Sequence, residues 1–252
     1  MKRLATTALV SALALGIGSM AHADYDPALA GGTLRMVASQ GSGTIDPHIN
    51  YTSGYWNLFQ ATYDGLIAFQ KANGADGFVI VPNLAEAIPE ATNDGKTYVF
   101  QLRKGIKFSN GKDVDVNDVV ASLQRLFKVS SPTSGSFYNI IVGADACLAT
   151  PATCTLEGGV VADAAAGTVT INLTRPDPEF LYKLAVPHAV ILPADSPAED
   201  VGTQPLPGTG TYVISSYDPN KGIVLTRNPH FTQWSEAAQP TAYPDEVRLD
   251  FG

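Results

Sequence analysis

Hydrophobic and polar residues alternate along two stretches of the chain in the way that half-buried strands require. In 97–103 every second residue is apolar, and 167–176 repeats the pattern with Val169, Ile171 and Leu173 on one side. Since successive side chains of a strand point to opposite faces, each stretch presents one apolar and one polar face. The pattern predicts two strands, each with one face on a core.

Four further segments have strand character. The range 210–228 contains two strand-like runs around the turn "DPNKG" and predicts a hairpin. The segment 31–39 follows two glycines and is interpreted as a buried first strand, and 64–69 as another strand. The stretch 246–251 is typical of the start of a further strand, with no closing element after it.

A period of three to four residues replaces the alternation after residue 115. Asp115 fits a helix N-cap, and Asp118 three residues on lies near the positive end of the predicted helix. One face of this helix carries its apolar residues: Val119, Val120, Leu123, Leu126 and Phe127. We expect the helix to end near Lys128, and 177–186 to form a second, short helix.

Another helix is predicted from the spacing of apolar residues over 55–62, capped by Thr52 or Ser53. Most aromatic residues of the chain have core spacing, but Tyr55 and Trp56 lie beside a small-residue loop, and one of them could line a cleft. Helices and strands mix without regular alternation. The expected class is therefore α/β or α+β with mixed sheets.

The first 23 residues have the composition of a secretory signal peptide. Lys2 and Arg3 precede an apolar run that is short for a membrane span, and 21–23 fits a cleavage pattern. A membrane anchor is the alternative, and no stop-transfer pattern supports it. Removing the two basic residues leaves 16 − 2 = 14 Lys and Arg against 24 Asp and Glu, a net charge of 14 − 24 = −10. This charge argues against nucleic acid or an anionic membrane as the main partner.

The two cysteines, Cys147 and Cys154, lie close together in an exported chain, where oxidising conditions favour a local disulfide. Pro151 between them helps the intervening loop to turn. A metal or redox site is the alternative, but a redox dithiol prefers the C-x-x-C spacing and no histidine lies nearby in sequence. The pair is interpreted as a structural clip.

No catalytic constellation is evident. The histidines of the predicted mature chain, His48, His188 and His230, have no metal-ligand spacing, and no nucleophile elbow or phosphate fingerprint occurs. Lys104, Lys107 and Lys112 flank a turn and are interpreted as a solvated rim.

The glycines of 41–43 allow either a turn or close approach of a ligand to the backbone. The absence of a catalytic constellation favours a binding module over an enzyme, with no cofactor and no metal.

The order of several segments resembles the family 5 extracellular solute-binding proteins, the dipeptide, oligopeptide and nickel receptors of ABC importers. The similar segments are 63–69, 81–128, 167–187 and 208–231. The most specific of them is "FQLRKGIKFSNGK" (100–112) with the helix that follows it. The resemblance covers nearly the whole predicted mature chain.

This resemblance implies a periplasmic-binding-protein type II fold, in which two lobes close on a ligand. Residues 24–61 and 186–252 would form the first lobe and 62–185 a domain inserted in it. Family members are longer, so we expect an N-terminal fragment that lacks the second lobe, where peptide-binding members place the charged groups that hold ligand termini.

The resemblance also implies ligand contacts from two regions: the loop Gly41, Ser42 and Gly43, and His188. A buried or surface histidine with satisfied hydrogen bonds is the alternative for His188. The expected protein is a periplasmic monomer, cleaved after Ala23, that passes a short peptide or similar polar ligand to a membrane permease.

Two other functions compete with this interpretation. A secreted hydrolase would need a nucleophile with a base, or a metal, supplied from outside this sequence. A short protein that binds a partner through its exposed first lobe is disfavoured, because an unpaired strand at 246–251 would invite aggregation.

Overall fold

The fold is that of a computed structural model, which describes residues 26–39 and 43–252. The predicted signal peptide lies outside the described residues. The helices and strands are β1 Thr33–Ala38, α1 Ser53–Thr62, β2 Ile67–Phe69, β3 Ile80–Pro82, β4 Thr97–Gln101, α2 Val116–Lys128, α3 Ala144–Ala149, β5 Val160–Asp163, β6 Thr168–Asn172, α4 Phe180–Leu184, β7 Tyr212–Asp218, β8 Gly222–Arg227 and β9 Glu246–Phe251. Four short 3-10 helices connect them.

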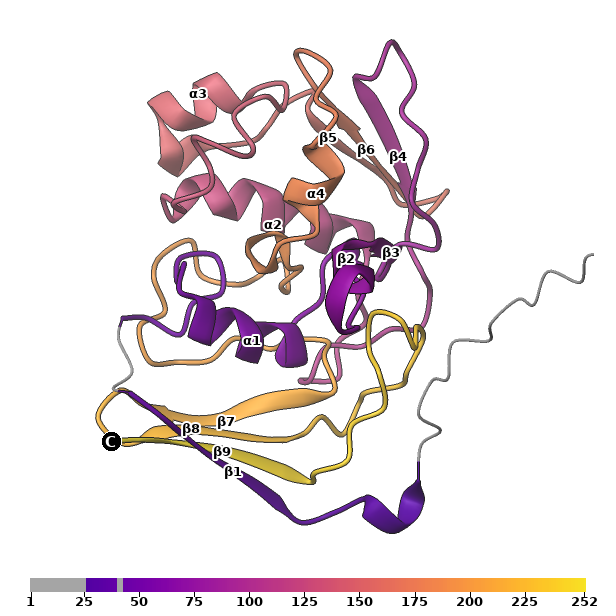
Figure 1. Cartoon of the computed structure of the whole chain (residues 1–252). Helices are drawn as coiled ribbons and strands as arrows, with labels where there is room; N and C mark the ends of the chain where they lie inside the picture. The colour runs from indigo at the N-terminus through magenta and orange to yellow at the C-terminus, as the bar shows by residue number, and fades with distance from the viewer. Residues whose placement is uncertain (1–25, 40–42) are drawn as a thin grey trace, which may run out of the picture.

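Three sheets form the framework. The largest has the order β1-β9-β8-β7, with β1 parallel to β9 and the other neighbours antiparallel. The sheet β4-β6-β5 lies at the opposite end of the molecule beside α2, and the small pair β2-β3 lies between the two (Figure 1). This mixed arrangement confirms the predicted α/β class. The predicted hairpin is β7-β8, and the predicted alternating strands are β4 and β6.

Two predictions about the large sheet were wrong. The first strand, β1, is exposed along nearly its whole length, with Leu34 and Met36 almost half exposed, because it is the edge strand and α1 covers only the far part of the sheet. The segment 246–251 is not an unpaired edge: β9 lies between β1 and β8 and is hydrogen-bonded to both. Pairing with a strand more than 200 residues away in sequence gives no local signal.

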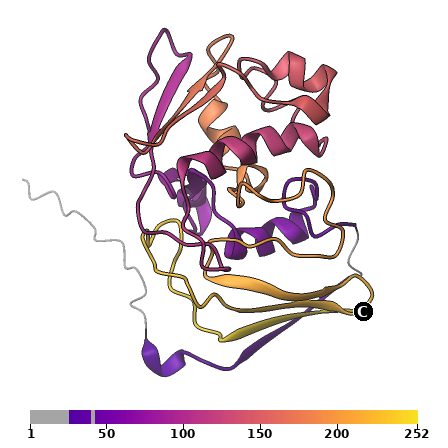
Figure 2. The ribbon, with the colours of Figure 1, turned by 180° about the vertical axis from the view of Figure 1, so that it is seen from behind.

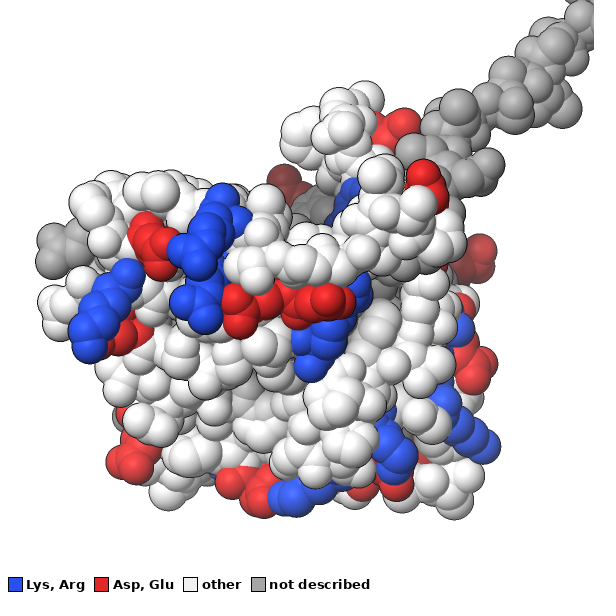
Figure 3. Space-filling model, turned by 90° about the horizontal axis from the view of Figure 1, so that it is seen from below, with Lys and Arg blue, Asp and Glu red and all other residues white. Residues whose placement is uncertain are grey.

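The α-helices of the described residues lie on one side only of the large sheet, as the two opposite views agree (Figures 1 and 2). Its other face is charged: Arg248 pairs with Glu246 on β9 at 2.7 Å, and the Thr33 hydroxyl of β1 donates to the same carboxylate. From below, basic and acidic side chains alternate across this face (Figure 3). Such interleaved charges are typical of a solvated sheet face.

The buried apolar side chains form two clusters. One joins α1 to the inner face of the large sheet through Phe59, Tyr212 and Leu225 among others. The larger cluster fills the space between α2, the sheet β4-β6-β5 and α4, and includes Phe127 and Phe180. Segment 189–192 contributes alternate residues to both clusters, so the two cores share this wall.

Helix α2 begins as the sequence predicts. The Asp115 carboxylate accepts from the backbone N–H groups of Asn117 and Asp118, and Asp118 accepts from the Asp115 N–H, which completes a capping box. Removing such a cap typically costs about 1 kcal/mol. The predicted apolar face is buried apart from Val120, which is half-buried. Helix α1 has Thr52 as its N-cap residue, without a side-chain capping bond.

The predicted disulfide between Cys147 and Cys154 is present, and both residues are buried in the larger apolar cluster. It closes α3 onto the 3-10 helix at Pro151–Thr153, an element that sequence patterns did not predict. A clip across so short a loop contributes about 2 kcal/mol in the chain-entropy model.

Candidate functional site

The carboxyl ends of β1 and β9 lie at one edge of the large sheet, where the register pairs Ala38 with Phe251. Ligands of open sheets bind beyond such carboxyl ends. Gly43 lies at this edge with φ +79°, a conformation that favours glycine. Its carbonyl oxygen accepts from the Tyr217 hydroxyl at 2.8 Å, which lies 2.8 Å from the Tyr55 hydroxyl. The edge is therefore held in place from both β7 and α1.

The predicted ligand loop is only partly described. Gly41 and Ser42 lie outside the described residues, and Gly43 ends the gap. From Gly43 the chain continues through a turn fixed by Asn50, whose side-chain amide donates to the Thr44 carbonyl at 2.7 Å and accepts from the Thr52 hydroxyl at 2.8 Å. The backbone after the predicted loop therefore returns to the start of α1.

His188, the other predicted site residue, lies under an aromatic pair. It is fully buried, and the Tyr51 and Trp56 rings lie 4.8 and 5.5 Å from its own, centroid to centroid. Tyr51 is about half exposed (49%) and contacts Trp56 edge-on at 5.1 Å. Tyr51 and Trp56 flank the N-terminus of α1, so the structure brings His188 beside the turn that follows Gly43.

Polar atoms of this aromatic cluster are unsatisfied. Three buried nitrogen atoms have no hydrogen-bond partner among the described residues: the two ring nitrogens of His188 and the indole nitrogen of Trp56. Burial lowers the pKa of His188 to about 4. The Asn50 backbone, which approaches the ring without reaching hydrogen-bond geometry, and the Asp46 carboxylate act in the opposite direction. His188 is therefore neutral at pH 7. Unpaired buried polar groups are costly, so a ligand that supplied partners would be favoured here.

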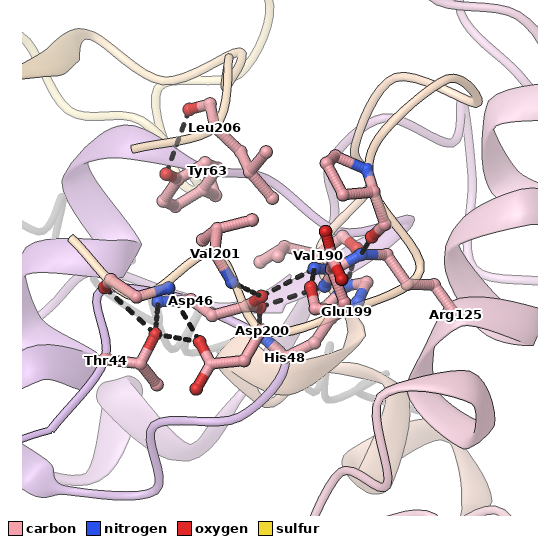
Figure 4. A network of polar contacts seen from close by, with 12 residues as sticks. Thr44, Asp46, His48, Tyr63, Arg125, Val190, Glu199, Asp200, Val201 and Leu206 are labelled. Carbon is pink, nitrogen blue, oxygen red and sulfur yellow. Dashed lines mark hydrogen bonds and ion pairs between the residues drawn. The ribbon is translucent and has the colours of Figure 1, made fainter. Parts of the chain in front are cut away.

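A buried ion pair between Arg125 and Asp46 lies at the centre of a second polar network (Figure 4). Arg125 of α2 donates to the two carboxylate oxygens of Asp46 at 2.9 and 2.5 Å, and both side chains are at most 4% exposed. The same guanidinium donates to the carbonyls of Pro197 and Glu199, and the Val201 N–H donates to Asp46. The guanidinium of Arg125 and the carboxylate of Asp46 thus join α2, the turn after Gly43 and the segment 197–201.

Electrostatics in this network follow from burial and from one cation. Burial alone would raise the pKa of Asp46, but the hydrogen bonds and charge of Arg125 outweigh it and hold that pKa below its ordinary value. His48 lies next to the pair, 3.0 Å from the Val190 carbonyl through Nε2. Burial, with the Arg125 charge, lowers the pKa of His48 to about 4. The network therefore consists of an ion pair and a neutral histidine. It supports the fold and is not suited to acid–base catalysis.

In the described part of the chain, the side chains that donate to a second buried carboxylate, Asp64, are all neutral. It accepts from Asn83 at 2.9 Å, from the Thr209 hydroxyl at 2.8 Å and from the Gln239 amide at 2.9 Å. The Trp234 indole N–H in turn donates to the Asn83 side-chain oxygen at 3.0 Å. This group joins four segments that are distant in sequence.

The sequence did not indicate several of these residues. Tyr51 looked like an ordinary loop residue, and Arg125 like any polar residue of an amphipathic helix. Among the residues that the structure describes, no three His, Cys, Asp or Glu side chains gather closely enough to hold a metal ion. In the same part of the chain, no helix is long and apolar enough to cross a bilayer.

Comparison with solved structures places this fold among the periplasmic peptide-binding proteins of type II. "Clavulanic acid biosynthesis oligopeptide binding protein 2" is 29% identical with a TM-score of 0.74, over 88% of this chain and 40% of that one. The murein tripeptide-binding protein of Escherichia coli has the same fold, with a TM-score of 0.70 at 23% identity, over 87% of this chain and 42% of that one.

The family model "Bacterial extracellular solute-binding proteins, family 5 Middle" matches residues 79–252. The chain belongs to this family of solute-binding proteins, which confirms the resemblance in its sequence. Among curated relatives, the periplasmic oligopeptide-binding protein of Escherichia coli (strain K12) is 32% identical over 203 residues, 77% of this chain and 35% of that one. Di/tripeptide-binding protein 1 of Pseudomonas aeruginosa (strain UCBPP-PA14) is 26% identical over 234 residues, 84% of this chain and 38% of that one.

The chain spans between 34 and 38% of the length of the first curated relatives it matches. The family and these matched proteins are binding proteins by name, not enzymes.

Proposed function

We propose that the chain is the first part of the substrate-binding component of an ABC importer, which captures short peptides and delivers them to a membrane permease. The names of its relatives, which bind dipeptides, tripeptides and oligopeptides, support a peptide ligand. We further propose export to the periplasm with cleavage after Ala23, and a monomeric state. Two observations together support the proposal. The chain matches the family, and an aromatic cluster lies near the carboxyl edge of the large sheet.

The proposed ligand contacts come from two regions. The loop 41–43 offers backbone groups to the peptide, because its small residues let a ligand approach closely. Tyr51 and Trp56 form an apolar platform for a peptide side chain, and aromatic faces supply such contact area at low entropic cost. His188 reaches the ligand through its unpaired nitrogens when the half-exposed Tyr51 ring rotates aside.

We also propose that the domain division lies at 62–185, with 24–61 and 186–252 forming one lobe around that insertion. The two separate apolar clusters support this division. With this division, Arg125 belongs to the insertion and Asp46 to the lobe, so the buried ion pair lies between the two parts.

Calorimetric titration of the complete gene product with tri-alanine and with a tripeptide that contains phenylalanine tests the proposal. We expect saturable heat, tighter for the aromatic peptide, and about tenfold or more weaker binding after Tyr51→Ala, as typical for loss of an aromatic contact. Tyr182→Ala is the matched control, because Tyr182 is equally exposed (48%) but lies on α4.

If neither peptide gave binding heat and a sugar or a metal chelate did, the assignment of a peptide ligand would be wrong. Hydrolysis of the peptide during the titration would instead favour the alternative of a secreted hydrolase.

A further inference from the structure

A cavity of about 710 Å³ opens at the opposite end of β7 from Gly43. Tyr212, the first residue of β7, lines this cavity, whereas Tyr217 near the strand's end contacts Gly43. The two tyrosines are five positions apart along the strand, which corresponds to about 17 Å. The volume lies within the range of roughly 300–1,000 Å³ that small-molecule sites occupy. The cavity is therefore large enough for a ligand and separate from the proposed peptide site.

The cavity walls come from four segments and combine apolar with polar side chains. Phe69 is the last residue of β2, Phe78 ends the 3-10 helix that follows it, and Pro240 belongs to the segment before β9. Phe78 is 76% exposed, which is unusual for so large an apolar side chain. The second half of α1 closes another side with Gln60 and its neighbours. An apolar body entering here would cover aromatic surface that water now contacts.

One cation, Lys71, lines the cavity. Its ammonium donates to the Gln60 backbone carbonyl, and a lysine ammonium has three hydrogens to donate. Burial lowers the pKa of Lys71, although the Asp64 charge acts in the opposite direction. A carboxylate next to the ammonium would favour its charged form and would accept a charge-assisted hydrogen bond.

Gln239 supplies a second, orphaned polar group. It is 2% exposed, and its Nε2 donates to the Asp64 carboxylate at 2.9 Å. Because a carboxylate only accepts, this bond fixes the orientation of the amide and leaves Oε1 as an acceptor on its other side. Oε1 is buried and has no partner among the described residues, while Gln239 lines the cavity. Oε1 itself is covered, so a ligand N–H reaches and satisfies this acceptor only when the cavity wall at Gln239 shifts.

We propose that this cavity is a second binding site, for a carboxylate that carries an adjacent N–H donor and an aromatic or other large apolar body. The carboxylate binds Lys71, the N–H donates to Gln239, and the apolar body contacts Phe69 and Phe78. An N-acylated aromatic amino acid and the C-terminal residue of a polypeptide share this chemistry. The site is independent of the proposed peptide capture at the sheet edge.

The test titrates N-acetyl-L-phenylalanine into the complete gene product and follows the heat. Two analogues each lack one group: 3-phenylpropionate has no N–H, and N-acetyl-L-phenylalaninamide has no carboxylate. We expect saturable binding of the first compound and at least about tenfold weaker binding of both analogues. Glycyl-glycyl-glycyl-phenylalanine distinguishes the sources, because comparable Lys71-dependent affinity points to a polypeptide C-terminus and its absence to the free acylated amino acid.

Two variants assign the binding to the cavity. Lys71→Met should weaken N-acetyl-L-phenylalanine at least about tenfold, while Lys104→Met, a change at an exposed lysine outside the cavity, should leave it unchanged. Phe78→Ser removes an exposed side chain from the cavity wall and should weaken binding without lowering the unfolding temperature. It therefore tests the cavity even if the Lys71 variant does not fold.

Tyr51→Ala should leave this binding unchanged, so failure of the peptide site and failure of the cavity site give different results. Equal affinity of wild type and Lys71→Met, or no saturable heat up to about 10 mM, would overturn the proposal.

Discussion

Asp46 and Asp64 are two fully buried carboxylates that hold distant segments together in different ways. Asp46 accepts from the guanidinium of Arg125, whereas the side chains that donate to Asp64 are two amides and a hydroxyl. In the first case the charge is compensated by a single opposite charge in a forked geometry. In the second, three neutral donors hold the carboxylate, and the nearby charge of Lys71 acts on it only from beyond ion-pair distance. The comparison shows two solutions to one problem, the burial of a carboxylate, and they should fail differently.

The largest effect should follow from removing the cation. Arg125→Met keeps the apolar stem of the side chain but leaves Asp46 buried without its partner, and breaking one half of a buried pair costs about 3–5 kcal/mol. Two carbonyls, of Pro197 and Glu199, also lose their donor. Chemical denaturation followed by circular dichroism should show this loss of unfolding free energy.

Lys128→Met is the control for the arginine variant, because it lies on the same helix and is only half-buried. Its change in unfolding free energy should stay within about 0.5 kcal/mol, as for ordinary surface substitutions. If Arg125→Met were no more destabilising than Lys128→Met, the ion pair would contribute nothing to the junction.

Acidification should weaken the region around Asp46 next most strongly. His48 and His188 both have pKa values of about 4 when folded, against about 6.5 when unfolded, so the unfolded chain binds more protons between these values. Stability contributed by the neutral histidines is complete above about pH 6.5 and is lost as the pH falls toward 4. The free energy of unfolding should drop by about 2–3 kcal/mol from about pH 7 to about pH 5.5.

The double variant His48→Asn and His188→Asn tests the source of this pH dependence. Denaturation curves of the variant should be nearly flat over the same pH interval, because no lowered histidine pKa remains in this region. An unchanged acid slope in the double variant would assign the effect to carboxylates elsewhere.

The contrast between the two carboxylates also marks what sequence patterns can predict. The N-cap and the apolar face of α2 were predicted because every signal lies within 14 consecutive residues, Asp115 to Lys128. Arg125 sits on that helix, but its partner is 79 residues away and its burial depends on how α2 meets the turn after β1. Pattern and propensity determine an element, not the neighbour that covers it.

The same limit explains the wrong prediction for β1 and the incomplete one for the site. An apolar strand reads as buried, yet β1 is exposed because it lies at the sheet edge. His188 was inferred only from a family resemblance. Its contact with Tyr51 and Trp56 joins residues more than 130 positions apart, and no local pattern signals such a contact.

Removing the charge of Asp64 should cost less than removing the cation from Asp46. In Asp64→Asn the remaining oxygen can still accept from Thr209 and Gln239, but the new NH2 group faces the Asn83 amide, whose oxygen is already engaged by Trp234. One unsatisfied contact between donors costs about 2 kcal/mol. Denaturation of this variant beside Asp46→Asn, which confronts Arg125 with a neutral partner, compares the two environments. A larger loss for Asp64→Asn than for Asp46→Asn would reverse the order that we expect.

The smallest effect should come from a single neutral donor to Asp64. Thr209→Val replaces the fully buried hydroxyl by a methyl group of similar size, so packing is kept while one hydrogen bond to the carboxylate is lost. Such a loss should lower the unfolding free energy by about 1–2 kcal/mol, because two other side chains still donate to Asp64. Thr209→Ser retains the hydroxyl and separates the bond from the methyl contact. If the valine variant lost as much as Arg125→Met, the distributed donors would act as one unit, and the two carboxylates would not differ in the way argued above.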